Sequence, residues 1–268
     1  MFLEMIEYFF TPCPRYLRKM GFLSELLGIK VRYRRCRKAW EPHLDQTMNV
    51  IRDGISLCSQ RRKAVIFGSG MLYDVPLADL AAQFREVLLV DLVQPLRARN
   101  LARKFSNVRL ITADVTGVIE SLSRLAPLSK EPLPECRSSL FLDDPEIDFV
   151  ASVNLLSQLP HIPTSFLRKL GSYDVTLRDQ LGTTLIREHL SYLRKFAGVV
   201  TLVSDVQRLK LKDGNVVESH SAIYDVPIPW SGKRWVWHLA PRPEASRIYS
   251  FHREVVGIAN IHATKERS

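Results

Sequence analysis

The stretch Ala64-Val-Ile-Phe-Gly-Ser-Gly70 sets a continuous apolar run directly before a pair of glycines. Four apolar residues in a row, none of them suited to face solvent, indicate a strand that is buried on both faces of a sheet. Glycines after such a strand let the backbone turn sharply and approach another group closely, and a following helix offers free N–H groups. The stretch therefore predicts a strand, a tight turn and a helix, although a glycine pair can also serve the turn alone.

The same alternation of short apolar runs and amphipathic segments continues along the chain. Further buried runs lie at Val87–Val90, Val108–Thr112, Ile147–Val153 and Val199–Ser204, and a long helical segment spans Val175–Phe196. Strands that are apolar throughout and separated by helices predict a doubly wound α/β fold, with a mostly parallel sheet and helices on both faces. Asp213-Gly214, between two alternating segments, predicts an antiparallel hairpin at the C-terminal end.

Residues 1–60 have a different character and look mainly helical. Pro42 suits the first turn of a helix, and apolar side chains then recur at helical spacing at Leu44, Met48, Ile51, Ile55 and Cys58. We therefore predict two parts: an N-terminal helical extension over residues 1–60, and an α/β domain over residues 61–268. The extension is expected to cover the sheet or a cleft at its edge.

Two carboxylates stand where successive strands end. Ligands of open α/β sheets bind beyond the carboxyl ends of the strands. Asp91 lies 23 residues after Gly68, close to the spacing of about 20 residues expected of an acid that accepts ribose hydroxyls. Asp114 ends the next strand, where it could accept an adenine amino group while Val115 packs on the ring. Capping of the following helix is the open alternative for Asp114.

These segments resemble motifs of the class I S-adenosylmethionine (SAM)-dependent methyltransferases. The resemblance covers roughly residues 63–205 and includes Leu88-Leu-Val-Asp91, Ile111-Thr-Ala-Asp114 and Asp148-Phe-Val-Ala-Ser-Val-Asn-Leu-Leu-Ser-Gln-Leu-Pro160. It implies a Rossmann-like fold, SAM as cofactor and a divergent methyltransferase. The cofactor contacts it implies are Gly68, Ser69, Gly70, Asp91, Asp114, Val115 and Asn154.

Two positions depart from the family pattern. The apolar pair Ile66-Phe67 replaces an acid near the end of the first strand, and Leu72 replaces the third glycine of the turn. Asp74, which follows closely, is interpreted as the cap of the next helix. The departures leave a non-catalytic binding or scaffold protein of the same fold as an alternative. An NAD(P)-dependent oxidoreductase is another, since that class also uses a glycine turn after its first strand.

Methyl transfer is an in-line displacement, so an enzyme mainly positions the acceptor and removes its proton. Asn154 and Asp205, at the ends of the fourth and fifth strands, are the candidates for catalysis, with turn roles as the alternative. His189 lies on the apolar face of its helix and is interpreted as a core residue. The candidates for substrate contact are Ser157, Gln158 and Trp237.

The chain of 268 residues carries a formal charge of +10, and its basic residues are concentrated near the start. Nine Lys or Arg and a single acid lie between Cys13 and Lys38. Such a segment attracts phosphates, nucleic acid or an anionic surface, although a solvated helix face is the common alternative. Residues 15–38 are therefore the candidate segment for such a partner, while a small-molecule substrate is favoured.

The cysteines and histidines argue against a disulfide-rich protein and against a metal-binding protein. The four cysteines form no CxxC pair and the seven histidines are scattered, which predicts reduced thiols, no metal site and a cytoplasmic protein. No stretch reaches the about 20 apolar residues that a membrane span needs.

Overall fold

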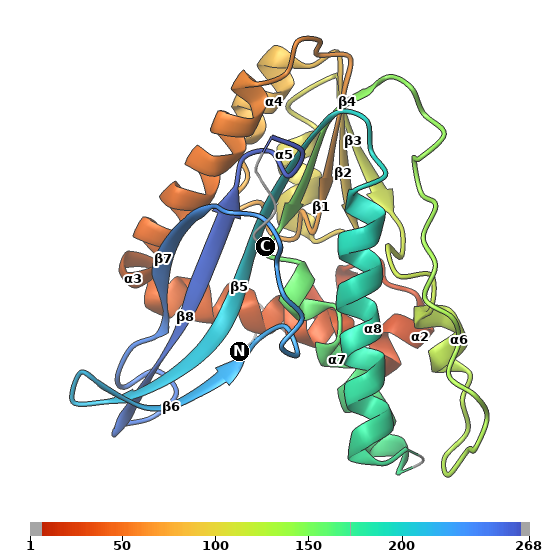
Figure 1. Ribbon diagram of the computed structural model, residues 1–268, viewed down its shortest axis with the longest axis vertical. Helices are drawn as coiled ribbons and strands as arrows, with labels where there is room; N and C mark the ends of the chain where they lie inside the picture. The colour runs from red at the N-terminus through yellow and green to blue at the C-terminus, as the bar shows by residue number, and fades with distance from the viewer. Residues whose placement is uncertain (1–6, 172, 264–268) are drawn as a thin grey trace.

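A computed structural model describes residues 7–171 and 173–263, and a single eight-stranded sheet forms its centre (Figure 1). The strand order is β3-β2-β1-β4-β5-β8-β7, with β6 paired to β5 off this path. Strands β1 to β5 are parallel, whereas β6 and β8 run antiparallel to β5, and β7 runs antiparallel to β8. The predicted mostly parallel sheet with an antiparallel end is confirmed. The strands are β1 (Lys63–Phe67), β2 (Glu86–Asp91), β3 (Val108–Thr112), β4 (Ile147–Val153), β5 (Val199–Lys212), β6 (Asn215–Ser221), β7 (Lys233–Ala240) and β8 (Tyr249–Ile258).

Helices cover both faces of the sheet because neighbouring residues of each buried strand point to opposite sides. Val65 and Phe67 pack in one core cluster with α2, α6, α7 and α8, whereas Ala64 and Ile66 pack in another with α4, α5 and the end of α3. This is the doubly wound arrangement that the sequence predicts. The helices are α2 (Arg15–Met20), α3 (Phe22–Ser56), α4 (Leu77–Gln83), α5 (Leu96–Ala102), α6 (Ile119–Ser123), α7 (His161–Leu170) and α8 (Val175–Leu193), with a short 3-10 helix η1 (Leu156–Gln158).

Helix α3 is longer than the sequence indicates and is bent. The prediction that Pro42 begins a helix is wrong, since Pro42 lies inside the 35-residue helix. A proline inside a helix lacks the N–H that would bond to the preceding turn and commonly bends the helix there. Figure 1 shows α3 changing direction, so that one limb runs along the sheet and the other crosses toward α7 and α8. Within the described ranges, no helix has the length and apolar character needed to cross a membrane.

The antiparallel end begins where β5 continues past the parallel part of the sheet. The predicted fifth strand ends near Ser204, but β5 extends to Lys212 and pairs there with β6 and β8. The hairpin turn predicted at Asp213-Gly214 is confirmed, and both residues have positive φ, at +49° and +86°, as a tight two-residue hairpin turn requires. A β-bulge interrupts the pairing of β5 with β8 between Asp205 and Gln207.

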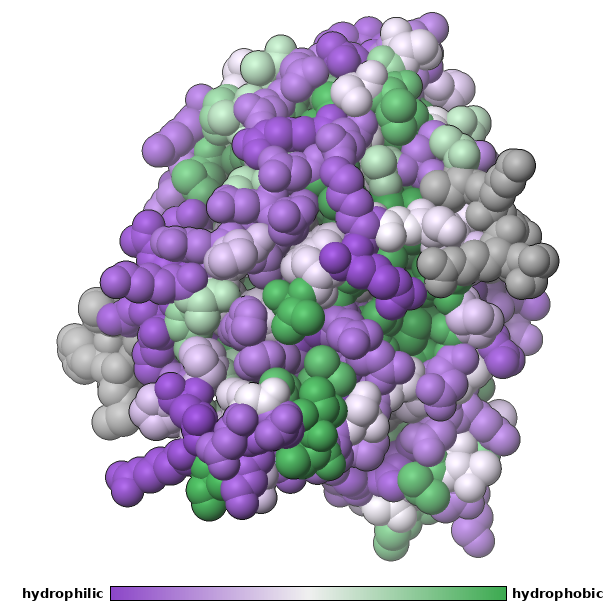
Figure 2. Space-filling model, turned by 60° about the vertical axis from the view of Figure 1, so that its left-hand side comes forward, coloured by the Kyte–Doolittle hydropathy of each residue, from purple (hydrophilic) through white to green (hydrophobic). Residues whose placement is uncertain are grey.

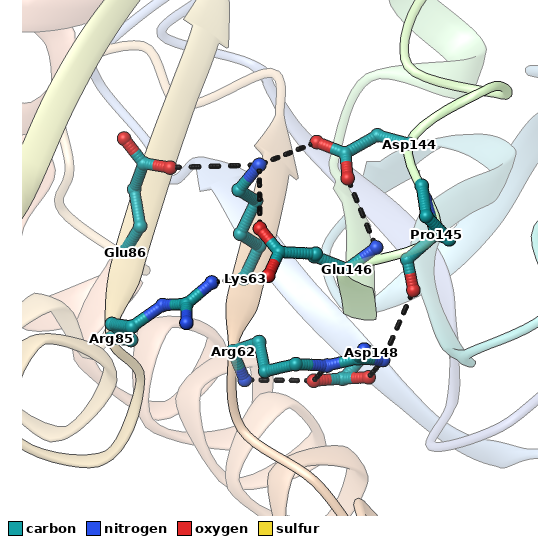
Figure 3. Close-up of polar contacts among 8 residues, drawn as sticks. All are labelled: Arg62, Lys63, Arg85, Glu86, Asp144, Pro145, Glu146 and Asp148. Atoms are coloured by element: carbon teal, nitrogen blue, oxygen red, sulfur yellow. Dashed lines mark hydrogen bonds and ion pairs between the residues drawn. The ribbon is translucent and has the colours of Figure 1, made fainter.

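Ion pairs tie together the amino ends of the central strands (Figure 3). The guanidinium of Arg62 donates to both carboxylate oxygens of Asp148, at 2.6 and 3.1 Å, and Lys63 pairs with Asp144 at 2.7 Å. Glu146 joins the group through Lys63 at 3.3 Å. These contacts hold the amino ends of the parallel strands together. Open α/β sheets bind their ligands at the opposite, carboxyl ends of the strands.

Candidate functional site

The turn after β1 adopts a backbone conformation that glycine takes most readily. Gly68 and Gly70 have φ of +73° and +44°, in the left-handed region. A Cβ atom on Gly68 would lie 2.8 Å from the carbonyl oxygen of Val153, so the turn packs closely against the end of β4. A Cβ on Gly70 would have no heavy atom nearer than 3.8 Å among its described neighbours. A side chain at Gly68 would therefore clash with β4, whereas one at Gly70 would meet no close neighbour.

Leu72 keeps the glycine-like conformation of the position it occupies. Its φ is +55°, and its side chain is buried in the core cluster that also contains Ile66 and Leu77. The leucine therefore preserves the left-handed turn and adds an apolar side chain to the core beneath it.

Asp91 closes the glycine turn from the end of β2. Its Oδ2 accepts a hydrogen bond from Gly70 N at 2.8 Å, and burial raises the pKa of its carboxyl. Next to it, Ser69 is buried and its hydroxyl has no hydrogen-bond partner in the described part of the chain. A carboxylate at a strand end, an unpaired hydroxyl and a left-handed glycine turn together fit the polar groups of an adenosine cofactor.

Asp114 and Val115 lie at the end of β3 but face different surroundings. Both oxygens of Asp114 accept backbone hydrogen bonds: one from Thr116 N, in the turn before α6, at 2.8 Å, and one from Ile119 N, the first residue of α6, at 2.9 Å. This is the capping alternative of the sequence interpretation. Val115 lines a cavity of about 10 Å³ together with His189, which has room for roughly one water. A contact of Asp114 and Val115 with adenine stays a prediction.

His189 itself has the contacts of a core residue. It is 3% exposed, and its Nε2 lies 2.9 Å from Ser152 Oγ on β4. Burial lowers its pKa to about 4, so the ring is neutral. The interpretation of His189 as a core histidine is confirmed.

Asn154 connects three elements at the end of β4. Its Nδ2 donates to Asp74 Oδ2 at 2.7 Å and lies 3.3 Å from His43 Nε2 on α3. Its φ of +48° turns the chain sharply after the strand, and asparagine tolerates this conformation better than most residues. The second ring nitrogen of His43 accepts from Trp235 Nε1 at 3.0 Å. The arrangement brings side chains from α3, β4, β7 and the turn after β1 into one network.

The interpretation of Asp74 as a helix cap is wrong. Helix α4 begins only at Leu77, after Pro76 as its N-cap residue, and the Asp74 side chain is directed to Asn154 instead. Burial raises the pKa of Asp74. The sequence interpretation did not identify His43, whose contacts come from residues 111 and 192 positions away. Its only local signal is a histidine on the buried face of α3, near Thr47 and Ile51.

The hydrogen bonds around His43 restrict where protons lie. Because an indole nitrogen only donates, Trp235 fixes the proton of the neutral imidazole on Nε2. Burial lowers the pKa of His43 to about 3, so the ring carries no second proton. Its Nε2–H finds an acceptor when the Asn154 amide turns Oδ1 toward it, and the carboxyl of Asp74 must then be protonated to donate to the same oxygen. With the amide the other way round, an ionised Asp74 accepts from Nδ2, but the Nε2–H of His43 then faces this second donor without an acceptor. The network therefore satisfies all of its donors only when Asp74 holds a proton.

The other predicted residues form a second group beside this network. The Ser157 hydroxyl donates to Asp205, which also pairs with Arg253 Nε at 3.4 Å. Gln158 Nε2 donates to the backbone oxygen of Asn154 at 2.6 Å. The structure therefore brings Asn154, Ser157, Gln158 and Asp205 together, the first three directly after β4 and Asp205 within β5, which continues to Lys212.

Aromatic side chains of α3 and β7 pack around His43 and the segment after the glycine turn. The Trp237 ring stacks on His43 with ring centroids 4.1 Å apart. Tyr33 stacks on Tyr73, in the segment after the glycine turn, at 3.7 Å. Trp237 thus lies at the predicted site while also packing against the helix, and the N-terminal extension covers the sheet edge as expected.

The basic segment lies on α2 and the first part of α3. The side chains of Arg34, Arg35, Arg37 and Lys38 are exposed, and Figure 2 shows a largely hydrophilic face on this side of the molecule. Glu244 pairs with Arg35 at 2.7 Å. Part of the positive charge is therefore balanced within the chain.

Comparison of the sequence with protein-family models gives no match, and comparison with curated proteins gives none. Among solved structures, the chain is similar to a complex of DhpI with SAH, at 16% identity and a TM-score of 0.37, covering 87% of this chain and 94% of that one. It is also similar to the 1,6-didemethyltoxoflavin-N1-methyltransferase of Burkholderia thailandensis with bound S-adenosylhomocysteine, at 15% identity, a TM-score of 0.38 and 91% coverage of each chain. A third similar structure is the N-methyltransferase NodS of Bradyrhizobium japonicum, at 11% identity and a TM-score of 0.35, covering 79% of this chain and 85% of that one.

These similarities are weak, so the fold is assigned from the strand order and directions described above. Five parallel strands in the order β3-β2-β1-β4-β5, followed by antiparallel strands, form the mostly parallel sheet with an antiparallel end that the sequence predicts. The chain therefore has a doubly wound, Rossmann-like fold.

Proposed function

We propose that the protein binds SAM at the Gly68–Gly70 turn and transfers its methyl group to a small-molecule acceptor. The observation that carries the proposal is the hydrogen bond from Gly70 N to the Asp91 carboxylate. It unites the glycine turn and the strand-end acid at the carboxyl edge of a parallel sheet, where such folds bind ligands. Ser69 adds a buried hydroxyl that has no partner among the described residues.

In this proposal each group of the site has a distinct task. Asp91 accepts hydrogen bonds from the ribose hydroxyls, and the backbone N–H groups of the turn face the rest of the cofactor. When bound at this turn, SAM would supply an electrophilic methyl group to the acceptor. Asn154 orients the acceptor, and the aromatic residues of α3 and β7 exclude water from the site.

Asp74 is the proposed proton acceptor. An acceptor O–H or N–H that becomes methylated must lose a proton. Asp74 lies within the His43–Asn154 network, whose donors are all satisfied only when this carboxyl is protonated, so the network favours uptake of a proton there. Because burial raises the pKa of Asp74, this carboxyl is a better base than an exposed aspartate.

Ligand binding to the full-length chain tests the proposal. S-adenosylhomocysteine should raise the unfolding temperature of the wild type, whereas NADH and NADPH should not. Asp91→Asn should weaken this binding about ten- to a hundredfold, because hydrogen bonds to a charged group are strong. Asp179→Asn, on the exposed face of α8, is the matched control and should bind like the wild type.

Two outcomes would contradict the proposal. Stabilisation by NADH in place of S-adenosylhomocysteine would favour the oxidoreductase alternative. No stabilisation by either ligand would favour a scaffold protein that has kept the fold.

A further inference from the structure

Two arginines lie directly opposite each other on neighbouring strands. In the register of β5 and β8, Arg208 pairs with Arg253, and on the other side of β8 Trp237 of β7 pairs with Arg253. Residues directly opposite across strands share a face of the sheet. Arg208, Arg253 and Trp237 therefore form a row on the face that α3 covers, where Trp237 stacks on His43. Like charges directly opposite each other destabilise a sheet. Stability of the sheet therefore does not explain why two arginines stand at these positions.

The β-bulge between Asp205 and Gln207 places a carboxylate on the same face. Asp205 pairs with Val255, which lies two residues from Arg253 and so on the same side of β8. Without the extra residue of the bulge, Asp205 and Arg208 would face opposite sides of β5, since their positions differ by three. The bulge thus brings Asp205 within reach of Arg253, at 3.4 Å, and next to the Ser157 hydroxyl that donates to it.

A third arginine approaches from α3. Burial is the largest cause of the lowered pKa of Arg253; Asp205 raises this pKa, whereas the like charges of Arg208 and Arg32 lower it further. The Nε atoms of Arg32 and Arg208 are buried, and each lacks a hydrogen-bond partner among the residues described. The carboxylate nearest to Arg32 Nε is Glu244, at 3.9 Å, which also pairs with Arg35. Two buried guanidinium N–H groups are therefore unsatisfied beside an excess of positive charge.

We propose that Arg32, Arg208 and Arg253, named here the arginine cluster, bind an anionic oxygen group of the methyl acceptor, a phosphate or a carboxylate. Guanidinium groups suit such groups because their N–H donors match two oxygens at once. The cluster connects to the proposed methyl-transfer site through Asp205, Ser157 and the Asn154–Gln158 loop. The inference rests on the proposed function, because it assigns the acceptor of that reaction to small anionic molecules.

Phosphate binding by the full-length chain tests the arginine cluster. Inorganic phosphate is titrated at constant ionic strength, with chloride as the balancing anion, and the unfolding temperature is followed. Phosphate should stabilise the wild type more than chloride does. Arg208→Gln and Arg32→Gln should each weaken phosphate binding about tenfold, as expected for the loss of a charged hydrogen bond. Arg187→Gln, an exposed arginine of α8, should bind phosphate like the wild type.

A second readout separates a binding role from a structural one. Without phosphate, Arg208→Gln should unfold at the same temperature as the wild type or higher, because it removes a like-charge pair. A variant that is less stable without phosphate and still binds phosphate normally would overturn the inference, as would equal effects of phosphate and chloride on the wild type. Tighter binding of a short single-stranded RNA than of phosphate, lost in Arg208→Gln, would overturn it in favour of a nucleic-acid substrate.

Binding of S-adenosylhomocysteine is measured in the same variants, so the two proposals can fail separately. If the cofactor binds and the arginine variants leave phosphate affinity unchanged, the inference about the acceptor is wrong and the proposed function stands. If phosphate binds at the cluster and the cofactor does not bind, the arginine cluster stands as an anion site and the methyltransferase proposal fails.

Discussion

Leu72 shows how a single residue can preserve a turn while changing its chemistry. A non-glycine residue in the left-handed region costs roughly 1 kcal/mol or more, yet Leu72 has a φ of +55° and is 5% exposed. Burial of the leucine side chain contributes about 2 kcal/mol, which is enough to offset that cost. The sequence signalled a missing glycine, but the preserved conformation follows from packing that only the three-dimensional structure reveals.

Replacement of Leu72 should therefore give an unusual order of stability. Alanine normally destabilises a protein less than glycine does, because glycine is more flexible in the unfolded chain. At this φ the order should reverse, with Leu72→Gly at least as stable as Leu72→Ala, and both less stable than the wild type by roughly 1–4 kcal/mol. Urea denaturation of the three proteins measures this. A clear advantage of the alanine variant would show that residue 72 is not left-handed.

Asp74 should reveal its burial through the pH dependence of stability. Its folded pKa is raised above the unfolded value, so the charged carboxyl disfavours folding at neutral pH, and this penalty fades as the pH falls through the folded pKa. Asp74→Asn should thus be more stable than the wild type at pH 7, with the difference shrinking toward pH 4. Denaturation at several pH values measures the difference. A variant that is less stable at pH 7 would contradict the assigned environment.

At the scale of residues, the sequence predicts a contact well where the partners are near in the chain. Asp91 could be placed beside the glycine turn because the spacing from strand to strand is regular. Asp74 and His43 could not, since their partner Asn154 is 80 and 111 residues away. Pro76 lies two residues after Asp74 and directly before α4. This made the capping interpretation of Asp74 reasonable, but the Asp74 side chain bonds to Asn154 instead.

Among the elements, strands were easier to predict than the long helix. A buried parallel strand has a continuous apolar run that ends at polar residues, so β1 to β4 could be located closely. Helix α3 was misjudged because proline is found both at helix starts and at bends. The bulge in β5 has no local sequence signal, and so the row that contains Arg208 and Arg253 could not be foreseen.

The ion pairs at the amino ends of β1 and β4 should stabilise the sheet in a pH-dependent way. The hydrogen bonds from Arg62 hold the pKa of Asp148 below its usual value. This contribution is present above the unfolded pKa and is lost as the pH falls through the folded one. Asp148→Asn should therefore lower the unfolding temperature at pH 7 and have little effect in strong acid. Asp143→Asn, an exposed neighbour on the same loop, should match the wild type throughout, and equal loss in both variants would contradict this role.

Across the whole molecule, the charged groups at the amino ends of the parallel strands differ in environment from those at the carboxyl ends. At the amino ends, the charges form ion pairs that contact solvent, as between Arg62 and Asp148. The carboxyl edge carries carboxylates with raised pKa values at Asp74, Asp91 and Asp205. Buried carboxylates that destabilise the folded state are typical of ligand sites. The bent α3 covers the carboxyl ends of these strands, and its His43 lies beside Asn154. The N-terminal extension is therefore part of the proposed site.

Binding of an adenosine cofactor at the carboxyl ends of the parallel strands can be measured by calorimetric titration of the 268-residue chain with S-adenosylhomocysteine. We expect saturable binding of one ligand per chain, with the affinity reduced about ten- to a hundredfold in Asp91→Asn. No binding heat with the folded wild-type protein, or an Asp91→Asn variant that binds as tightly as the wild type, would contradict it.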